Sequence, residues 1–240
     1  MNEYSFNRPI IIEGATNGEL EYIISSVTSR HDKNLRGYDV IEGFFEGLPL
    51  VIGKNKVGTI DAALFTQQLF FYYNPTLLIS QGTAGSHLET LHTGDIVIGE
   101  RVRDTSSFGM TEEALKELEI AAEGEWSIDE IYHSDAELME LALKTPYSHG
   151  KVVKGTIGTG DFWTYGTEEI KALSKRFGTT CEEMETFATA KTCAMYDVPF
   201  LSVRIISNNE MSGESFEPAA MRYVQEYVLD ILRNYGKTIE

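Results

Sequence analysis

The chain alternates between short apolar runs and longer stretches in which apolar residues recur at helical spacing. The run RPIIIEG at 8–14 ends in glycine, and four apolar residues between Leu20 and Val27 then recur within 17–30. Apolar runs of roughly four to eight residues are typical of buried strands, whereas steps of three and four residues indicate a helix. The sequence therefore predicts a strand, a loop and a helix at the beginning of the chain.

The same alternation continues along the chain and predicts an α/β fold with a central sheet. No internal repeat and no linker-like run divides the sequence, so we expect one domain over residues 1–240. The segment 111–145 is predicted as amphipathic helical material around a surface break. The other predicted strands lie within 38–54 (two strands), 75–86, 94–102, 151–162 and 199–207, and the other predicted helices lie at 57–73, 167–176, 182 onward and 217–236.

Composition excludes several classes of protein. The net charge of −17 repels phosphate backbones, so neither nucleic acid nor an anionic membrane surface is an expected partner. No stretch approaches the roughly 20 apolar residues that span a bilayer, and residues 1–19 lack a basic leader, so we expect a cytoplasmic protein. Cys181 and Cys193 show no metal-ligand spacing and are expected to be buried thiols.

Polar and glycine-rich residues follow the predicted strands. In α/β folds ligands bind beyond the carboxyl ends of strands, which makes 14–19, 81–86, 159–163 and 207–210 the candidate site segments. The turns QGTAGS and GTIGTG match neither the Walker A nor the GxGxxG pattern. The histidines have no metal spacing and no serine lies in a GxSxG elbow, so we expect a small-molecule ligand and no metal or organic cofactor.

Three acidic residues, Glu182, Glu183 and Glu185, bracket Met184 where the chain enters a helix of small and apolar residues. Acidic residues are favoured in the first turn of any helix, so spacing alone is compatible with three solvated side chains. A carboxylate there would also gain from the helix dipole if it faced a ligand. The pattern by itself leaves both interpretations open.

Five motifs in order resemble the nucleoside phosphorylase and nucleosidase superfamily, and in particular its methylthioadenosine/S-adenosylhomocysteine nucleosidases. The resemblance covers nearly the whole chain and diverges in about 99–150 and after Asn208. It implies a single-domain α/β/α sandwich with a central mixed, twisted sheet. The motifs are IIEGATNGE at 11–19, GTAGSHLETLHTGDIVI at 82–98, GTGDF at 158–162, EEMET at 182–186 and VPFLSVRIIS at 198–207.

The resemblance implies hydrolysis of the N-glycosidic bond of a purine nucleoside, with a role in methionine salvage. Glu19, four positions after Ala15, matches the catalytic glutamate that activates water. Glu183, Met184 and Glu185 match a Glu-Met-Glu motif whose methionine lies against the ribose and whose second glutamate accepts hydrogen bonds from its hydroxyls. The remaining candidate contacts are Thr83 for the water or sugar, Trp163 and Ser207 near the purine, and Val57 and Phe216 toward the 5′-group.

The type of nucleophile can be inferred from charge. A phosphate nucleophile needs a cationic partner, and the phosphorylases of this superfamily carry an arginine just before the glycine-rich turn. Here Ser80 and Gln81 occupy that place, and the early loop carries Glu19 instead of an arginine. We therefore expect water as the nucleophile and Glu19 as its general base.

Asn208 departs from the pattern, because adenine-specific members have an aspartate there that donates a proton toward purine N7. An amide can donate a hydrogen bond to N7 but has no proton to transfer. Either Glu210 serves as a substitute acid, or the base is a 6-oxopurine, as in inosine or futalosine. Asn208 as a plain turn residue, and a nucleoside-binding module without catalysis, are further alternatives. A homodimer is also expected, since 57–73 is apolar around much of its circumference.

Overall fold

The computed structural model describes residues 8–123, 127–128 and 130–239. Residues 1–7, which belong to the segment 1–19 expected to lack a basic leader, lie outside the described residues. The strands form one mixed sheet in the order β10-β6-β8-β9-β5-β1-β4-β3-β2, with β7 beside β6. Their bounds are β1 Ile10–Gly14, β2 Thr28–Leu35, β3 Tyr38–Phe45, β4 Leu48–Lys54, β5 Leu77–Ser86, β6 Ile96–Asp104, β7 Ile131–Tyr132, β8 Val152–Thr159, β9 Cys181–Glu183 and β10 Phe200–Asn208.

One half of the sheet closes on itself. Strand β10 pairs with β6 and also with β5, so β5, β10, β6, β8 and β9 form a ring. From β5 the other half continues through β1, which is parallel to both β5 and β4, and then through β4, which pairs antiparallel with β3, as β3 does with β2. The carboxyl ends of the mutually parallel strands β1, β5 and β10 therefore lie at one edge, where ligands bind in α/β folds.

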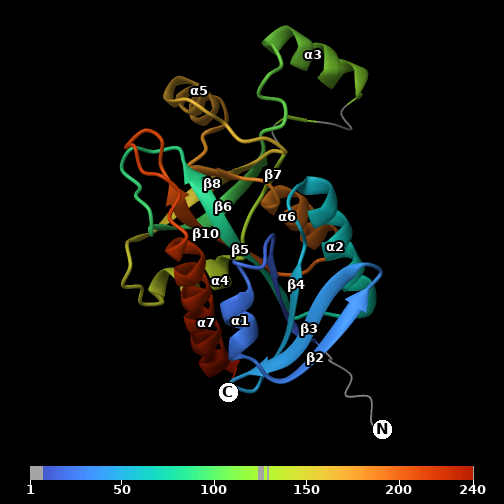
Figure 1. The fold of residues 1–240 in the computed structure, drawn as a ribbon. Helices are drawn as coiled ribbons and strands as arrows, with labels where there is room; N and C mark the ends of the chain where they lie inside the picture. Colours follow the sequence, from blue (N-terminus) through green and yellow to red (C-terminus); the bar gives the residue numbers. More distant parts are fainter. Residues whose placement is uncertain (1–7, 124–126, 129, 240) are drawn as a thin grey trace.

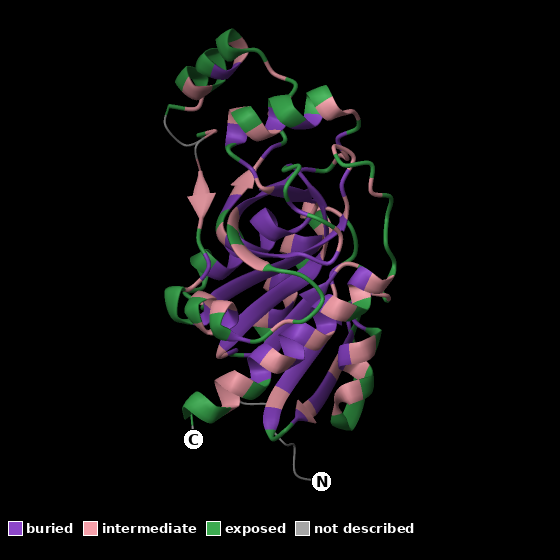
Figure 2. Cartoon of the chain, turned by 90° about the vertical axis from the view of Figure 1, so that its left-hand side faces the viewer, coloured by how far each residue is buried: buried purple, intermediate pink, exposed green. Residues whose placement is uncertain are grey.

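Helices cover both faces of the sheet (Figure 1), which confirms the predicted single-domain α/β class with a mixed central sheet. Helices α2 and α6 pack together on one face, and α1 and α4 pack against α7 on the other. The strands between them are mostly buried (Figure 2). The helices are α1 Glu21–Ser26, α2 Thr59–Tyr72, α3 Glu112–Ala121, α4 Ala136–Lys144, α5 Thr167–Phe177, α6 Thr186–Met195 and α7 Ala219–Ile239.

The first helix is shorter than predicted, and the prediction of helix to residue 30 was wrong. Helix α1 ends at Ser26, and β2 begins at Thr28 and pairs antiparallel with β3. The sequence TSRHDKNL of β2 has no apolar alternation, and only Leu35 is buried. An edge strand held by backbone hydrogen bonds to one neighbour needs no such alternation, so periodicity could not reveal it.

The EEMET segment is also not helical at its start. Residues Cys181–Glu183 form β9, which pairs with β5 and β8, and α6 begins only at Thr186. Glu183 holds this junction, because its carboxylate accepts hydrogen bonds from the backbone N–H groups of Glu185 and Thr186. The helix that follows is buried along most of its length, as expected for core.

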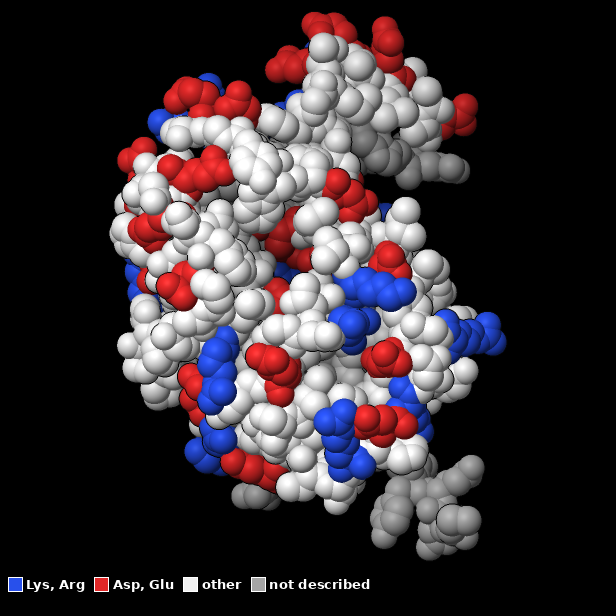
Figure 3. Space-filling view, viewed as in Figure 1, with Lys and Arg blue, Asp and Glu red and all other residues white. Residues whose placement is uncertain are grey.

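The predicted helical segment 111–145 contains α3 and α4, separated by the short strand β7. The expected surface break falls partly on 124–126 and 129, which lie outside the described residues. Helix α3 stands apart from the sheet at the same end of the molecule as α5 (Figure 1), and acidic side chains gather at this end (Figure 3). Among the described helices, none combines the length and apolar character needed to cross a membrane.

Candidate active site

Glu19 lies in the loop after β1 and reaches across to β5. Its Oε2 accepts hydrogen bonds from the N–H groups of Ala15 (3.1 Å) and Thr16 (3.0 Å) and from the Thr16 hydroxyl (3.0 Å). Its Oε1 accepts from the N–H (2.9 Å) and the hydroxyl (3.0 Å) of Thr83. A Cβ at Gly82 would stand 2.8 Å from this oxygen, so glycine is needed for the approach.

Five donors surround the two oxygens of Glu19, about as many as a carboxylate can accept. Three are backbone N–H groups, which cannot turn away. The hydroxyls of Thr16 and Thr83 can rotate to other acceptors and thereby leave room for another donor. The three backbone N–H donors can therefore hold Glu19 in place. One threonine hydroxyl can be replaced by a water molecule that gives up a proton to the carboxylate.

The three acidic residues of EEMET are all buried, with 4%, 4% and 8% exposure for Glu182, Glu183 and Glu185, so the interpretation as solvated first-turn acids is wrong. The Glu182 carboxylate accepts from the N–H (3.0 Å) and hydroxyl (2.7 Å) of Thr164. Glu185 accepts from the N–H of Gly58 (3.0 Å) and lines the same small cavity as Glu19.

Arg204, on β10, is a site residue that the sequence analysis missed. Its Nη2 lies 2.9 Å from Oε2 of Glu183 and 3.0 Å from the Ser80 hydroxyl, and only 2% of the residue is exposed. We expected no cation at the nucleophile site, and the position of Arg204 shows that this expectation was wrong. The arginine was visible in SVRIIS, but its side chain points toward the site only because β10 lies beside β5.

Burial and charge set the protonation of this cluster. Burial alone would raise the pKa of Glu183, yet the Arg204 charge and hydrogen bonds from Thr159 and Thr186 bring that pKa below its usual value. For Glu185, burial together with the neighbouring Glu183 charge raises the pKa to about 8. This cluster thus keeps the Glu183 carboxylate ionised against the arginine and favours a proton on Glu185 at neutral pH.

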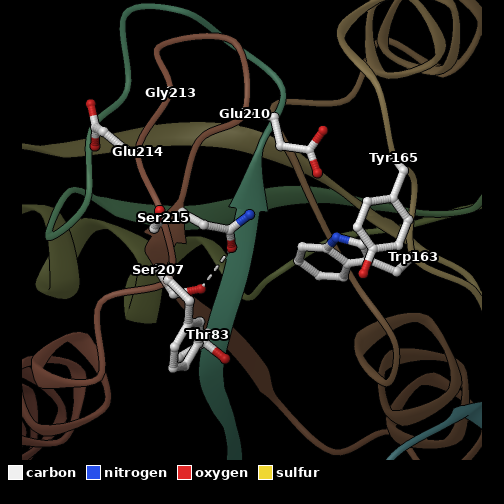
Figure 4. A pocket seen from close by; sticks show the side chains of 10 residues that line it. Thr83, Trp163, Tyr165, Ser207, Glu210, Gly213, Glu214 and Ser215 are labelled. Atoms are coloured by element: carbon white, nitrogen blue, oxygen red, sulfur yellow. Dashed lines mark hydrogen bonds between the residues drawn. The ribbon is translucent and has the colours of Figure 1, made fainter.

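A larger cavity of about 720 Å³ adjoins this cluster at Thr83 and opens beyond β10 (Figure 4). Trp163 and Tyr165 line one side of it, and the loop after Asn208 lines the other. A Cβ at Gly85 would come within 2.8 Å of the Trp163 ring, so glycine lets the indole lie against β5. An aromatic wall of this kind suits a planar base, and Tyr165 had not been singled out from the sequence.

Asn208 lines this cavity, as do Ser207 and Glu210. The Ser207 hydroxyl donates to Oδ1 of Asn208 at 3.1 Å, drawn as a dashed line in Figure 4. Glu210 points toward the same space and accepts from the N–H of Gly166 at 2.9 Å. The oxygen of the Asn208 amide is therefore partnered by Ser207, and no hydrogen bond from its nitrogen is found among the described residues, which leaves that nitrogen to a ligand.

The other residues predicted to contact the substrate do not all line the two cavities. Phe216 lines the large cavity and is 53% exposed. Val57 is 54% exposed and lies outside the linings of both cavities, as does the half-buried Met184. The carboxylate of Glu183 faces Arg204 and the start of α6 instead of open space. Glu19, Thr83 and Glu185 are brought together, with Trp163, Ser207 and Asn208 across the adjoining cavity.

Comparison with known proteins places this site in a family. The profile described as Phosphorylase superfamily matches residues 9–233. A 5′-methylthioadenosine/S-adenosylhomocysteine nucleosidase from Shewanella loihica is 30% identical over 205 residues, which are 82% of this chain and 85% of that protein. The protein of the same name from Haemophilus ducreyi is 29% identical over 236 residues, 94% and 97% of the two chains.

Solved structures share the fold. The nucleosidase of this kind from Neisseria meningitidis, in complex with methylthio-immucillin-A, superposes with a TM-score of 0.80 at 21% identity, covering 94% of this chain and 99% of that one. Futalosine hydrolase of Helicobacter pylori also has a TM-score of 0.80, at 18% identity, covering 94% and 97%. The chain therefore belongs to the phosphorylase superfamily, among relatives that are 5′-methylthioadenosine/S-adenosylhomocysteine nucleosidases.

Proposed function

We propose that this protein hydrolyses the N-glycosidic bond of a purine nucleoside of the methylthioadenosine or adenosylhomocysteine kind, releasing the free base and a ribose derivative. The observation that carries the proposal is the pairing of two buried carboxylates, Glu19 and Glu185, in one small cavity that adjoins the aromatic-walled cavity at Thr83. The names of the relatives support the same reaction.

Cleavage of this bond builds positive charge on the sugar. Glu185 accepts hydrogen bonds from the ribose hydroxyls, and its negative charge favours the cationic sugar. Glu19 takes a proton from the attacking water, in exchange for one of its threonine hydroxyl donors. Trp163 stacks on the purine, and Asn208 donates to N7, which stabilises the leaving base. Phe216 lines the 5′-side.

Water remains the proposed nucleophile even though Arg204 is present. The arginine is paired with Glu183, and the Glu19 carboxylate interacts with it as a second negative charge. A phosphate ion entering this cluster would meet carboxylates on several sides and an already neutralised cation. We therefore expect activity without phosphate, and no metal or organic cofactor takes part in the proposed steps.

A 6-oxopurine nucleoside is the second candidate substrate. Since the Ser207 hydroxyl occupies Oδ1 of Asn208, the amide presents N–H donors to the base. Hypoxanthine offers two neighbouring acceptors, N7 and O6, whereas adenine offers N7 beside a donor amino group. This geometry favours inosine- or futalosine-type substrates, unless Glu210 accepts from the adenine amino group or carries a proton to N7.

Base release tests the proposal. Purified protein is incubated separately with methylthioadenosine, adenosylhomocysteine, inosine and futalosine, with and without phosphate, and free base and sugar are measured. We expect base release with one of these substrates, a free ribose derivative as product, and the same rate without phosphate. Ribose 1-phosphate as product would refute hydrolysis, and tight nucleoside binding without any base release would favour the binding-module alternative.

We also propose a homodimer that works in the cytoplasm, where a methylthioadenosine substrate would place it in methionine salvage. Helix α2 presents large apolar side chains to solvent, including Ile60 at 72%, Leu64 at 54% and Phe71 at 73% exposure. On α6, Met195 is 72% exposed beside this face. Burying such a patch against a second copy would stabilise a dimer. Sedimentation at micromolar concentration tests this, and a monomeric mass would contradict it.

A further inference from the structure

A second, much smaller cavity adjoins the purine-side cavity at Thr83, which lines both of them. Its volume is about 10 Å³, which is room for the centre of one water molecule. Glu19, Glu185 and Arg204 line it, together with Asn55 from the loop after β4 and Gln81 from β5. The cavity therefore joins the proposed general base to two amide side chains that the proposed mechanism does not use.

Both amides present an unpartnered oxygen. Asn55 and Gln81 are each 1% exposed, and among the described residues neither Oδ1 of Asn55 nor Oε1 of Gln81 has a hydrogen-bond partner. The nitrogens of both amides already donate hydrogen bonds within the protein. Nδ2 of Asn55 donates to Glu13 at 3.4 Å, and Nε2 of Gln81 donates to the backbone oxygen of Glu19 at 2.6 Å. A buried carbonyl oxygen without a donor is costly, so two at one cavity indicate a small ligand that donates hydrogen bonds.

Arg204 supplies the complementary donor. Its Nη1 donates to the backbone oxygen of Val203 at 3.3 Å, and a Cβ on the cavity-lining Gly82 would lie 3.5 Å from that same nitrogen. A guanidinium Nη carries two N–H groups, so one of them remains to point toward the cavity. The cavity thus offers acceptors for two protons and a donor for one lone pair, which matches a single water molecule.

We propose that Asn55 and Gln81 bind the attacking water and determine which of its protons is lost; this inference rests on the proposed hydrolysis. One proton of the water goes to Glu19, and the other is shared between the two amide oxygens, which are too weakly basic to take it. The N–H of Arg204 donates to one lone pair, and the second lone pair is left to attack the anomeric carbon. The bond from that carbon to the purine nitrogen breaks, its electron pair leaves with the base, and the retained proton ends on the hydroxyl of the product sugar.

This arrangement selects water over other nucleophiles. An alcohol has one O–H proton, and its alkyl group would lie against the two carbonyl oxygens in a space that fits one water. Phosphate would bring negative charge toward those oxygens and the carboxylates. Removing the amide of Asn55 both enlarges the cavity and deletes an acceptor, so it should admit methanol.

The first measurement is steady-state kinetics of Asn55→Ala and Gln81→Met with the substrate that the wild type cleaves, with Asn234→Leu on the distant α7 as the matched control. Loss of one water contact should lower kcat roughly 10- to 100-fold and leave KM within about threefold, because the sugar and base contacts remain. Near-ultraviolet circular dichroism checks that each variant is folded. Since the two variants change different segments of the chain, the test stays valid if one of them fails to fold.

The second measurement is the product ratio in water–methanol mixtures, which a merely structural role would not change. We expect the wild type and Asn234→Leu to form almost only the free sugar, and Asn55→Ala to form several-fold more methyl glycoside. An unchanged kcat, or an unchanged methyl glycoside fraction in the folded variants, would overturn the inference about the water site. The proposed function would still stand in that case, because the wild type releases the base. Absence of base release by the wild type from every nucleoside would refute both.

Discussion

Glu13 offers a test of the physical reasoning that does not depend on the substrate. It lies on β1 with no solvent exposure, and its carboxyl group contacts the hydroxyls of Thr66 (3.0 Å) and Thr189 (3.2 Å) and the amide of Asn55. The Thr66 hydroxyl also donates to the backbone oxygen of Ala62 at 2.8 Å. Since a hydroxyl has one proton, Thr66 can satisfy both contacts if Glu13 is protonated and donates to it.

Burial raises the pKa of Glu13 from 4.5 to about 8, against the smaller opposing effects of its hydrogen bonds and of Arg204. Between these pH values the folded protein keeps the proton and the unfolded chain loses it, so the free energy of unfolding falls as pH rises. The contribution is fully present below about pH 4.5 and is lost by about pH 8. At 1.36 kcal/mol per pH unit, the loss over this range is about 5 kcal/mol.

Glu13→Gln tests this value, because glutamine imitates the protonated acid in shape and hydrogen bonding and does not titrate. The free energy of unfolding is measured by urea denaturation of both proteins at about pH 5, 7 and 9. Near pH 5 the two should agree within about 1 kcal/mol, and the variant should become more stable than the wild type by several kcal/mol at about pH 9. A difference that does not change with pH would show that Glu13 is not a buried neutral acid.

Three further predictions concern catalysis. Glu19→Gln keeps the size and hydrogen bonding of the side chain but removes the base, so kcat should fall roughly 10²- to 10⁴-fold with the fold intact; full activity would contradict its role. The pKa of Glu185 is raised to about 8, and its ionised form is the one that accepts the ribose hydroxyls, so kcat/KM should rise with pH and level off above about 8. Glu185→Gln should lose both the activity and this rise with pH. Wild-type kinetics in that variant would refute the role of Glu185. Asn208→Asp adds a group that can carry a proton to N7, so cleavage of adenine nucleosides should increase relative to inosine; an unchanged ratio would leave Asn208 as a turn residue and make Glu210 the next candidate.

Local patterns were sufficient for much of the fold and for the segments in which the candidate site residues lie. Apolar runs that end in glycine, such as IIIEG before Glu19, predicted strands that the structure confirms. The parallel strands β1, β5 and β10 end at the same edge, so residues just after them could be expected to converge. The segments 81–86 and 207–210 were singled out in this way, and the family resemblance then assigned Thr83 and Ser207 within them.

Tertiary structure alone decided which charged groups are buried and what they face. Arg204 and Glu183 lie 21 positions apart, and they form an ion pair because β10 closes the ring with β5 while β9 inserts between β5 and β8. The burial of Glu13 and the unpartnered oxygens of Asn55 and Gln81 likewise depend on neighbours from distant segments. Sequence periodicity describes a residue's own element, whereas desolvation and pKa depend on every element packed around it, and so the chemistry of this site could be completed only in three dimensions.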